Sequence, residues 1–440
     1  MKKIFYIFSL ITFFASAQAQ NVLTVDEAVA IALKNNYDVL LAQNNAEIAK
    51  ANNTLGNAGM LPSLGAVGNA SYALSNIENK ALNGSTTNFP NQGATSYGAG
   101  VELSWSILDG GRMFVTKERL NEIQALGELQ FQAQVLETAY EVIAVYYDIV
   151  RQKQQLKAIE EVITFNQERV KLAKAGVNAG SRIQSDLLQA KIDLNFAYEN
   201  QIIQETSMKS AKRYLNQLLV RDANTPVEVT DEILFSYIVD KEKLIEKLNS
   251  SNKNILAFQK QIEIAQLVLR ENKHAYFPSL DIRGGYYFSK TDYTDGSSPS
   301  SRIYNAQISN RVYGPQIGGT LKIPLYQAGE AKRRTRVAKL DMQSAEYNLD
   351  KTKLQMLVEL ENILEEFDAQ SRLLEIEEEN NRLTKQNLDI SMLRLRLGQT
   401  TSLEVHQAQQ NFVQSSARLV NFRYGLKIAE SQLRLLVSEL

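Results

Sequence analysis

Four segments of the chain alternate apolar and polar residues with a period of two, which is typical of β-strands with one buried face. The alternation is clearest from Val101 to Ile107, where a Glu or a Ser follows each apolar residue in turn. Polar stretches rich in Ser, Thr, Asn and Gly, 77–96 and 291–312, separate the strands of each pair and are predicted to be external loops. The strands themselves are predicted at about 63–76, 97–108, 280–290 and 313–323.

Segments of about ten residues that are apolar on one side and polar on the other are the signature of outer-membrane β-strands. Four strands cannot close a membrane barrel, because the smallest barrels use about eight, and an open edge in lipid leaves backbone groups unpaired. We therefore expect several copies of the chain to share one barrel. The alternative is a four-stranded soluble sheet with one wet face. The side chains expected to face lipid are Val101, Leu103, Trp105, Ile107, Ile282, Tyr286 and Phe288.

The scarcity of helix-breaking residues elsewhere predicts long helices. No proline lies between residues 91 and 225 or after 324, and most glycines gather around the predicted strands. Leu357, Leu360 and Leu364 step by three and four, as in a coiled-coil seam. At about 1.5 Å per residue, each of the two longest helices would span roughly 100 Å. The helices are predicted at 111–176, 182–219, 329–397 and 400–438, and a shorter helix is expected to open each half of the chain.

The same plan occurs twice along the chain, which indicates an internal duplication. The sequence Leu-Pro-Ser-Leu at 61–64 recurs as Phe-Pro-Ser-Leu at 277–280, an offset of 216 residues. Gly180 and Gly398 match at an offset of 218, because two residues are inserted after Leu108. The predicted organisation is a first repeat at 20–219, a linker at 220–239 and a second repeat at 240–440.

The N-terminal residues have the pattern of an export signal. Lys2 and Lys3 precede an almost wholly apolar run, and Ala17-Gln18-Ala19 supplies a cleavage pattern of small residues. A cleaved signal peptide is therefore predicted at residues 1–19, and the chain is expected to leave the cytoplasm.

Composition narrows the possible functions. The balance of 48 Lys+Arg against 49 Asp+Glu argues against nucleic-acid binding. The absence of cysteine excludes thiolate metal sites and disulfides, and His274 and His406 each stand without a second His or Cys nearby in sequence. No nucleophile motif, phosphate loop or metal-ligand cluster is apparent, so we predict no enzymatic activity, no cofactor and no metal.

These residues resemble the TolC-like family of outer-membrane efflux and secretion channels over essentially the whole mature chain. Four features carry the resemblance, and three of them occur in both repeats. They are an opening helix, Pro-Ser-Leu segments that lead into strands, strand-to-helix junctions that end in glycine, and Gly-containing turns between long helices. The opening helix is 23–28 with 32–36, and the Pro-Ser-Leu segments are 61–64 and 277–280. The strand-to-helix junctions are 107–112 and 323–329, and the turns are 179–190 and 397–408.

The resemblance implies a mixed α/β membrane protein and a homotrimer. Four strands per chain would form a shared transmembrane β-barrel, continued by a long coiled-coil α-helical barrel through the periplasm. The implied function is that of a channel subunit in a tripartite efflux pump or type I secretion system, passing substrates passively. The implied partners are a periplasmic adaptor protein, an inner-membrane transporter of the RND, ABC or MFS type, and outer-membrane lipid. The alternative is a periplasmic coiled-coil scaffold without channel activity.

The turns between the long helices are the candidate functional sites. Asp186 and Glu404 occupy matching positions after these turns, and the resemblance implies that such acids, with Arg182 and Thr400, constrict the periplasmic entrance. Charge rings at a narrow pore control which ions pass. The alternative is a carboxylate favoured in the first turn of a helix by the macrodipole. Adaptor docking is expected at the tips, through Gly180, Ser181, Leu187, Gly398, Gln399 and Val405.

Overall fold

The computed structural model describes residues 22–235, 237, 239–293 and 309–440. The predicted signal peptide lies outside these residues, as does most of the loop predicted at 291–312. The described chain divides into two compact units, and each unit combines segments of both repeats. The described residues of the first unit lie within 22–43, 131–253 and 353–440, and those of the second unit lie within 44–130 and 254–352.

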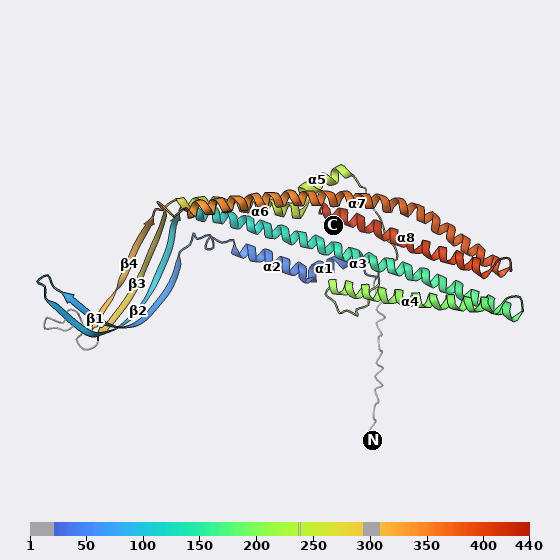
Figure 1. The fold of residues 1–440 in the computed structure, drawn as a ribbon, viewed down its shortest axis with the longest axis horizontal. Helices are drawn as coiled ribbons and strands as arrows, with labels where there is room; N and C mark the ends of the chain where they lie inside the picture. Colours follow the sequence, from blue (N-terminus) through green and yellow to red (C-terminus); the bar gives the residue numbers. More distant parts are fainter. Residues whose placement is uncertain (1–21, 236, 238, 294–308) are drawn as a thin grey trace, which may run out of the picture. The chain divides into compact units, whose positions relative to one another are not determined.

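The elements follow one another in the same order in the two halves of the chain (Figure 1). Two helices are followed by two strands, a very long helix and a shorter one. The first half contains α1 (Val25–Asn35), α2 (Tyr37–Asn52), β1 (Ser63–Lys80), β2 (Thr86–Asp109), α3 (Arg112–Asn178) and α4 (Gln184–Leu218). The second half contains α5 (Lys241–Ser251), α6 (Lys253–Lys273), a 3-10 turn (His274–Tyr276), β3 (Ser279–Tyr293), β4 (Ser309–Lys322), α7 (Glu330–Arg396) and α8 (Ser402–Leu436).

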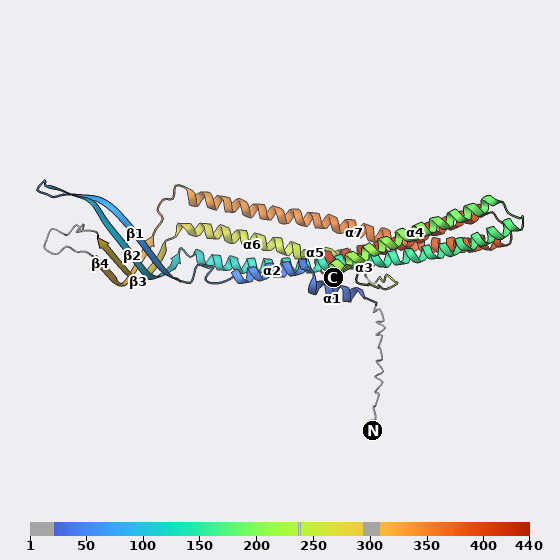
Figure 2. The same ribbon diagram turned by 90° about the horizontal axis from the view of Figure 1, so that it is seen from below.

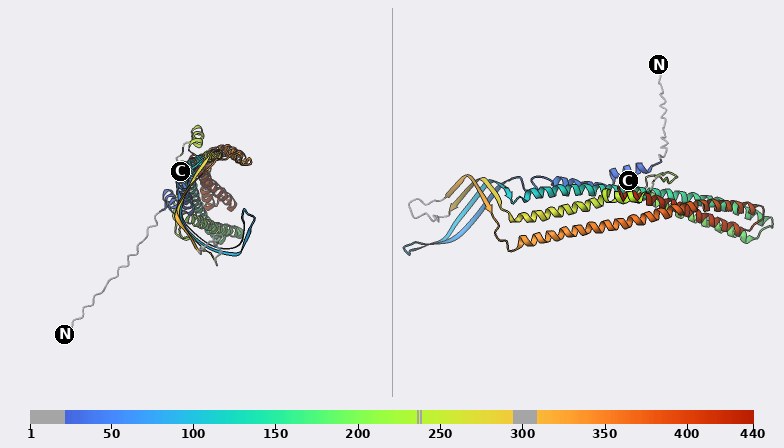
Figure 3. Two further views of the ribbon diagram at one scale, coloured as in Figure 1. Left: turned by 90° about the vertical axis from the view of Figure 1, so that its left-hand side faces the viewer. Right: turned by 90° about the horizontal axis from the view of Figure 1, so that it is seen from above.

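The four strands form one antiparallel sheet in the order β1-β2-β3-β4, within the second unit. Figure 3 shows the sheet from its end as a curved wall. Among the described residues, β1 and β4 are paired on one side only, so both edges of the sheet are open. The unpaired backbone groups of these two edges can pair with strands of other chains.

The first hairpin is longer than the alternation predicted. The stretch at 77–96, expected to be a loop, continues the two strands, and only residues 81–85 form the turn. Gly84 adopts a positive φ of 77° there, and the Ala81 N–H donates to the Ser85 carbonyl at 2.9 Å. The loop prediction was wrong because a strand that is polar on both faces shows no apolar period, although its backbone pairing continues on both sides of a bulge between Ser75 and Ile77.

Helices α3 and α7 each contain 67 residues without an internal proline, which corresponds to about 100 Å of helix. In the first unit α4 runs beside the later part of α3, and α8 runs beside the later part of α7 (Figures 1 and 2). Small apolar clusters hold each pair: Ala173, Leu187 and Ala190 lie between α3 and α4, and a larger cluster lies between α7 and α8. Within the described residues, no helix has an apolar stretch long enough to cross a membrane.

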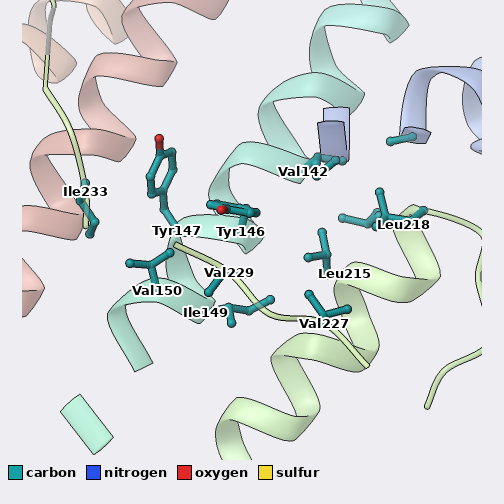
Figure 4. Packing of buried hydrophobic residues seen from close by; sticks show 13 residues of the cluster. Val142, Tyr146, Tyr147, Ile149, Val150, Leu215, Leu218, Val227, Val229 and Ile233 are labelled. Carbon is teal, nitrogen blue, oxygen red and sulfur yellow. The ribbon is translucent and has the colours of Figure 1, made fainter. Parts of the chain in front are cut away.

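The main core of the first unit joins α1, α3, α4 and the segment after α4 (Figure 4). Tyr146 is buried in it, and its hydroxyl donates to the Leu23 carbonyl at 2.7 Å and accepts from the Thr230 N–H at 3.1 Å. Val227 and Val229 pack against the same cluster. The segment that joins the repeats is therefore tied into the core of this unit by both apolar contact and hydrogen bonds.

One buried contact is made twice and reflects the duplication. The side-chain amide of Asn36 donates to the Leu218 carbonyl at 3.1 Å, and that of Asn252 donates to the Leu436 carbonyl at 2.8 Å. In each case an asparagine between two short helices satisfies a carbonyl at the C-terminal end of the last helix of its repeat. The matched pair supports the internal repeat predicted from the sequence.

Candidate channel entrance and membrane face

The turn between α3 and α4 is built on Gly180, which has a φ of 68°. Its N–H donates to the Val177 carbonyl, and the Ser181 N–H donates to the Gly176 carbonyl at 2.9 Å, which ends the helix by satisfying its last carbonyls. Arg182 packs over Gly176, where an added Cβ would stand 2.6 Å from the Arg182 Cδ. Its guanidinium then donates to the Leu395 carbonyl at 3.0 Å. Arg182 therefore links this turn to the last turn of α7.

In the matching turn between α7 and α8, the acidic residue Glu404 is held by side chains of the same repeat. Gly398 has a φ of 71°, and the Gln399 N–H donates to the Arg394 carbonyl at 2.8 Å. The Glu404 carboxylate accepts from the Arg394 guanidinium at 2.7 Å and from the Thr400 hydroxyl. About half of each side chain of this ion pair is exposed, so solvent screens it.

Asp186, which matches Glu404 in the first repeat, is not held by neighbouring side chains in this way. Its carboxylate makes no hydrogen bond or ion pair with any described residue, and Ile183 provides no side-chain cap for α4. The Thr401 hydroxyl, by contrast, accepts from the Glu404 N–H at 3.3 Å and caps α8. The structure thus brings Thr400 and Glu404 together and leaves Asp186 without a partner within the described chain.

The residues proposed for docking divide into exposed and buried groups. Gly180, Ser181, Gly398 and Gln399 are exposed at the two turns. Leu187 and Val405 are buried in the cores of the α3–α4 and α7–α8 pairs, because the first turn of each helix already faces its neighbour. In this chain those two side chains hold the helix pairs together and offer no surface at the tips.

A buried charged cluster near the tips was not expected from the sequence. The Arg169 guanidinium on α3 lies 3.0 Å from the Asp193 carboxylate on α4, with side-chain exposures of 1% and 5%. Arg169 also donates to Gln409 at 3.1 Å and to Ser402 at 3.2 Å, both on α8. The His406 imidazole lies 3.0 Å from the same Asp193 carboxylate. One arginine therefore joins three helices of the first unit.

Burial lowers the pKa of Arg169, and the neighbouring Asp193 carboxylate opposes that shift. A groove of about 350 Å³ opens beside the cluster, lined by Asn166, Asp193, Phe196, His406 and Gln409, among others. The signal that could have revealed the cluster is the position of Asn166 and Arg169 on the buried stripe of α3, where apolar residues are the rule.

The register of the sheet separates an apolar face from a polar one. Val101 pairs with Tyr286 and Trp105 with Ile282, so alternate residues of β2 and β3 share one side. Leu103 and Phe288 lie on this side, while Ile107 falls in a bulge between Ser106 and Leu108 and has no partner on β3. The Trp105 indole donates to the Met60 carbonyl at 3.0 Å, close to the end of the sheet where the helices begin.

Within the described ranges, no three His, Asp or Glu side chains gather closely enough to hold a metal ion. A curved antiparallel sheet that is apolar on one face, together with two helices of about 100 Å that each pair with a shorter helix, defines a class of protein. This is the class of outer-membrane channel subunits that combine a β-barrel with an α-helical barrel.

Comparison with known proteins gives the family. The outer membrane efflux protein family matches residues 28–220 and 244–439, one match in each repeat. The chain therefore belongs to the outer membrane efflux protein family, and the resemblance stated from its motifs is confirmed.

Individual relatives are distant but similar over much of their length. The outer membrane protein TolC of Vibrio cholerae is 21% identical over 299 residues, which are 67% of this chain and 66% of that protein. The proteases secretion protein PrtF of Dickeya chrysanthemi is 20% identical over 427 residues, covering 93% of this chain and 86% of PrtF. The crystal structure of the Campylobacter jejuni CmeC outer membrane channel superimposes with a TM-score of 0.76 at 17% identity, covering 94% of this chain and 85% of CmeC.

Proposed function

We propose that three copies of this chain form a passive channel through the outer membrane, delivering substrates from an inner-membrane transporter to the outside. The observation that carries the proposal is the four-stranded sheet, with one apolar face and two open edges within the described residues. Each unpaired backbone group in hydrocarbon costs several kcal/mol, so the edges need partner strands. Three copies would supply twelve strands, and the resemblance to the TolC-like channels favours this number over two or four.

The mass of the detergent-solubilised protein tests the shared barrel. We expect three chains per particle and ion conductance in planar bilayers after reconstitution. A periplasmic scaffold, the alternative function, would be released by osmotic shock and would behave as a folded species without detergent. That result would rule out the channel.

The periplasmic entrance of the channel is formed by the turns at Gly180 and Gly398. Asp186 and Glu404 then occur three times each around the mouth, and trivalent cations should bind there and block the current. The Glu404 carboxylate is paired with the Arg394 guanidinium, so this pair adds less net negative charge at the mouth than Asp186 does. We therefore expect Asp186→Ala to weaken the block more than Glu404→Ala does, with the trimer mass unchanged in both. Equal block in both variants and in the parent would leave these acids as ordinary helix-start residues.

The Arg182 guanidinium contributes a direct contact at the entrance, since it bonds across to the carbonyl of Leu395. A hydrogen bond to a charged group contributes about 1.5–3 kcal/mol. Arg182→Ser should therefore raise the leak through the resting channel, measured as current without partner proteins. An unchanged leak would show that this contact does not help to close the entrance.

The energy for transport comes from the partner, an RND, ABC or MFS transporter, through a periplasmic adaptor that docks at the exposed turns. The chain contains no cysteine, so single cysteines give unambiguous crosslinks. Ser181→Cys and Gln399→Cys should crosslink to the adaptor in cell envelopes. Leu187→Cys is the matched control, because Leu187 is only 8% exposed. Crosslinking through the buried position alone would contradict docking at the turns.

A further inference from the structure

One aromatic side chain on the polar face of the sheet lies flat against the backbone. Tyr287 on β3 pairs across the ladder with Gly100 on β2. Alternate residues of a strand share a face, so Tyr287 lies on the same side as Gly285 and Arg283 and on the opposite side from Tyr286. Tyr286 pairs with Val101 on the apolar face and is 55% exposed. Two successive tyrosines therefore point to opposite sides of the barrel wall.

The ring of Tyr287 occupies space that two glycines leave free. A Cβ added at Gly100 would stand 2.6 Å from the Tyr287 Cδ1, and one added at Gly285 would stand 2.8 Å and 2.9 Å from its Cε2 and Cζ. The Cβ at Gly285 would also stand 2.5 Å from the Val101 carbonyl oxygen, so the backbone requires glycine there as well. Gly285 precedes Tyr287 by two residues on the same face, and Gly100 lies directly across from it. The ring must therefore lie along the sheet over both glycines.

The neighbouring strand pair repeats this arrangement with a smaller side chain. Asn69 on β1 pairs with Gly98 on β2, and a Cβ at Gly98 would stand 2.2 Å from the Asn69 Oδ1. Gly98 and Gly100 are alternate residues of β2 and share the polar face. A band across three strands thus keeps its polar side chains close to the backbone, with glycine beneath each of them. The side chains of the polar face therefore project little from the sheet at the level of Tyr287.

We propose that Tyr287 sets the width of the pore at its level in the barrel, as a wall residue that Gly100 and Gly285 hold out of the lumen. This inference rests on the proposed channel function, because the polar face of an outer-membrane barrel faces the lumen. With one Tyr287 in each copy, rings that stood upright would narrow the passage from every side. Rings that lie flat leave it open and present their faces to passing solutes.

Cysteine substitution at the two successive tyrosines tests which side faces the lumen. In the cysteine-free chain, Tyr287→Cys and Tyr286→Cys each carry one thiol, and a bulky polar methanethiosulfonate can be attached to it. Attachment at Tyr287→Cys should reduce the single-channel current stepwise as successive copies react. Attachment at the matched control, Tyr286→Cys, should leave the current unchanged. An unchanged current after modification of Tyr287→Cys, or a thiol there that does not react, would overturn the proposal.

A double variant tests the role of the glycine. Gly100→Ala should displace the ring into the lumen and lower the conductance, and adding Tyr287→Ala should restore it by removing the ring. The added methyl also comes within 2.9 Å of the Tyr286 carbonyl, so backbone distortion is the competing cause of a lower conductance. Distortion would persist in the double variant, and a conductance that is not restored would contradict the proposal. A parent protein that forms trimers but does not conduct would instead refute the channel function itself.

Discussion

Removing the buried Arg169 should loosen the helices near the proposed entrance far more than removing an exposed arginine. Arg169→Met preserves most of the side-chain volume but leaves the Asp193 carboxylate, 5% exposed, without its guanidinium. Breaking a buried ion pair from one side costs about 3–5 kcal/mol. Gln189 still donates to Asp193 at 2.8 Å and His406 still lies 3.0 Å away, so we expect the lower end, about 3 kcal/mol.

Hydrogen exchange measured by mass spectrometry on the detergent-solubilised protein reports this loss locally. A change of about 3 kcal/mol corresponds to exchange faster by about two orders of magnitude. The effect should be confined to the facing parts of α3, α4 and α8, where Arg169 makes its contacts. The control is Arg382→Met, which removes an ion pair with Glu379 that is more than half exposed and contributes about 0–1 kcal/mol.

A double variant separates the ion pair from the volume change. Arg169→Met combined with Asp193→Leu replaces both charges with apolar groups, which is often neutral or stabilising for buried pairs. Its exchange should be slower than that of Arg169→Met alone. If Arg169→Met exchanges no faster than Arg382→Met, the buried pair does not hold these helices together.

Three further changes give shorter tests. Burial alone would raise the pKa of Glu377, but hydrogen bonds from Arg418 and Ser415 outweigh it and hold the pKa below 4.5. The contact between α7 and α8 should therefore weaken as the pH falls below that value, and Glu377→Gln should remove this pH dependence in thermal unfolding. Asn252→Ala should leave the Leu436 carbonyl unsatisfied and destabilise the first unit by about 1–3 kcal/mol, as measured by hydrogen exchange. An unchanged stability would show that water replaces the side-chain amide. Gly398 has a φ of 71°, so Gly398→Ala should lower the stability by about 1–2 kcal/mol and increase protease cleavage at that turn. Cleavage equal to that of the parent protein would argue against strain there.

The parts of the fold that the sequence predicts are those in which neighbouring residues share one environment. Val101 and Trp105 lie on one side of β2 because a strand alternates, and lipid or core selects apolar residues on that side. The long helices follow from the absence of proline in α3 and α7 and from positive-φ glycines beyond their ends. Asn36 and Asn252 match at an offset of 216 residues, and the carbonyls they satisfy match at 218, so the duplication is visible before any contact is known.

The parts that the sequence does not predict depend on how separate helices face one another. Arg169 and Asp193 meet because α3 and α4 turn particular faces inward, and spacing along one helix does not determine which residue of the next helix lies opposite. The bond from Arg182 to the Leu395 carbonyl also joins two turns more than 200 positions apart in the chain. Leu187 and Val405 were expected at the docking surface because they adjoin the turns, yet the first turn of each helix is already packed.

The two repeats share a backbone plan but differ in how firmly each turn is held. In the second repeat, Thr401 caps α8, and Glu404 is held by both Arg394 and Thr400. In the first repeat, Ile183 provides no cap for α4, and the bond from Arg182 to α7 is the side-chain link that the turn makes to the other repeat within the described residues. A cap contributes about 1 kcal/mol, so the turn at Gly180 has less local support than the turn at Gly398. We therefore expect the turn at Gly180, at the proposed entrance, to open locally more readily than the turn at Gly398, which should be measurable as faster amide hydrogen exchange.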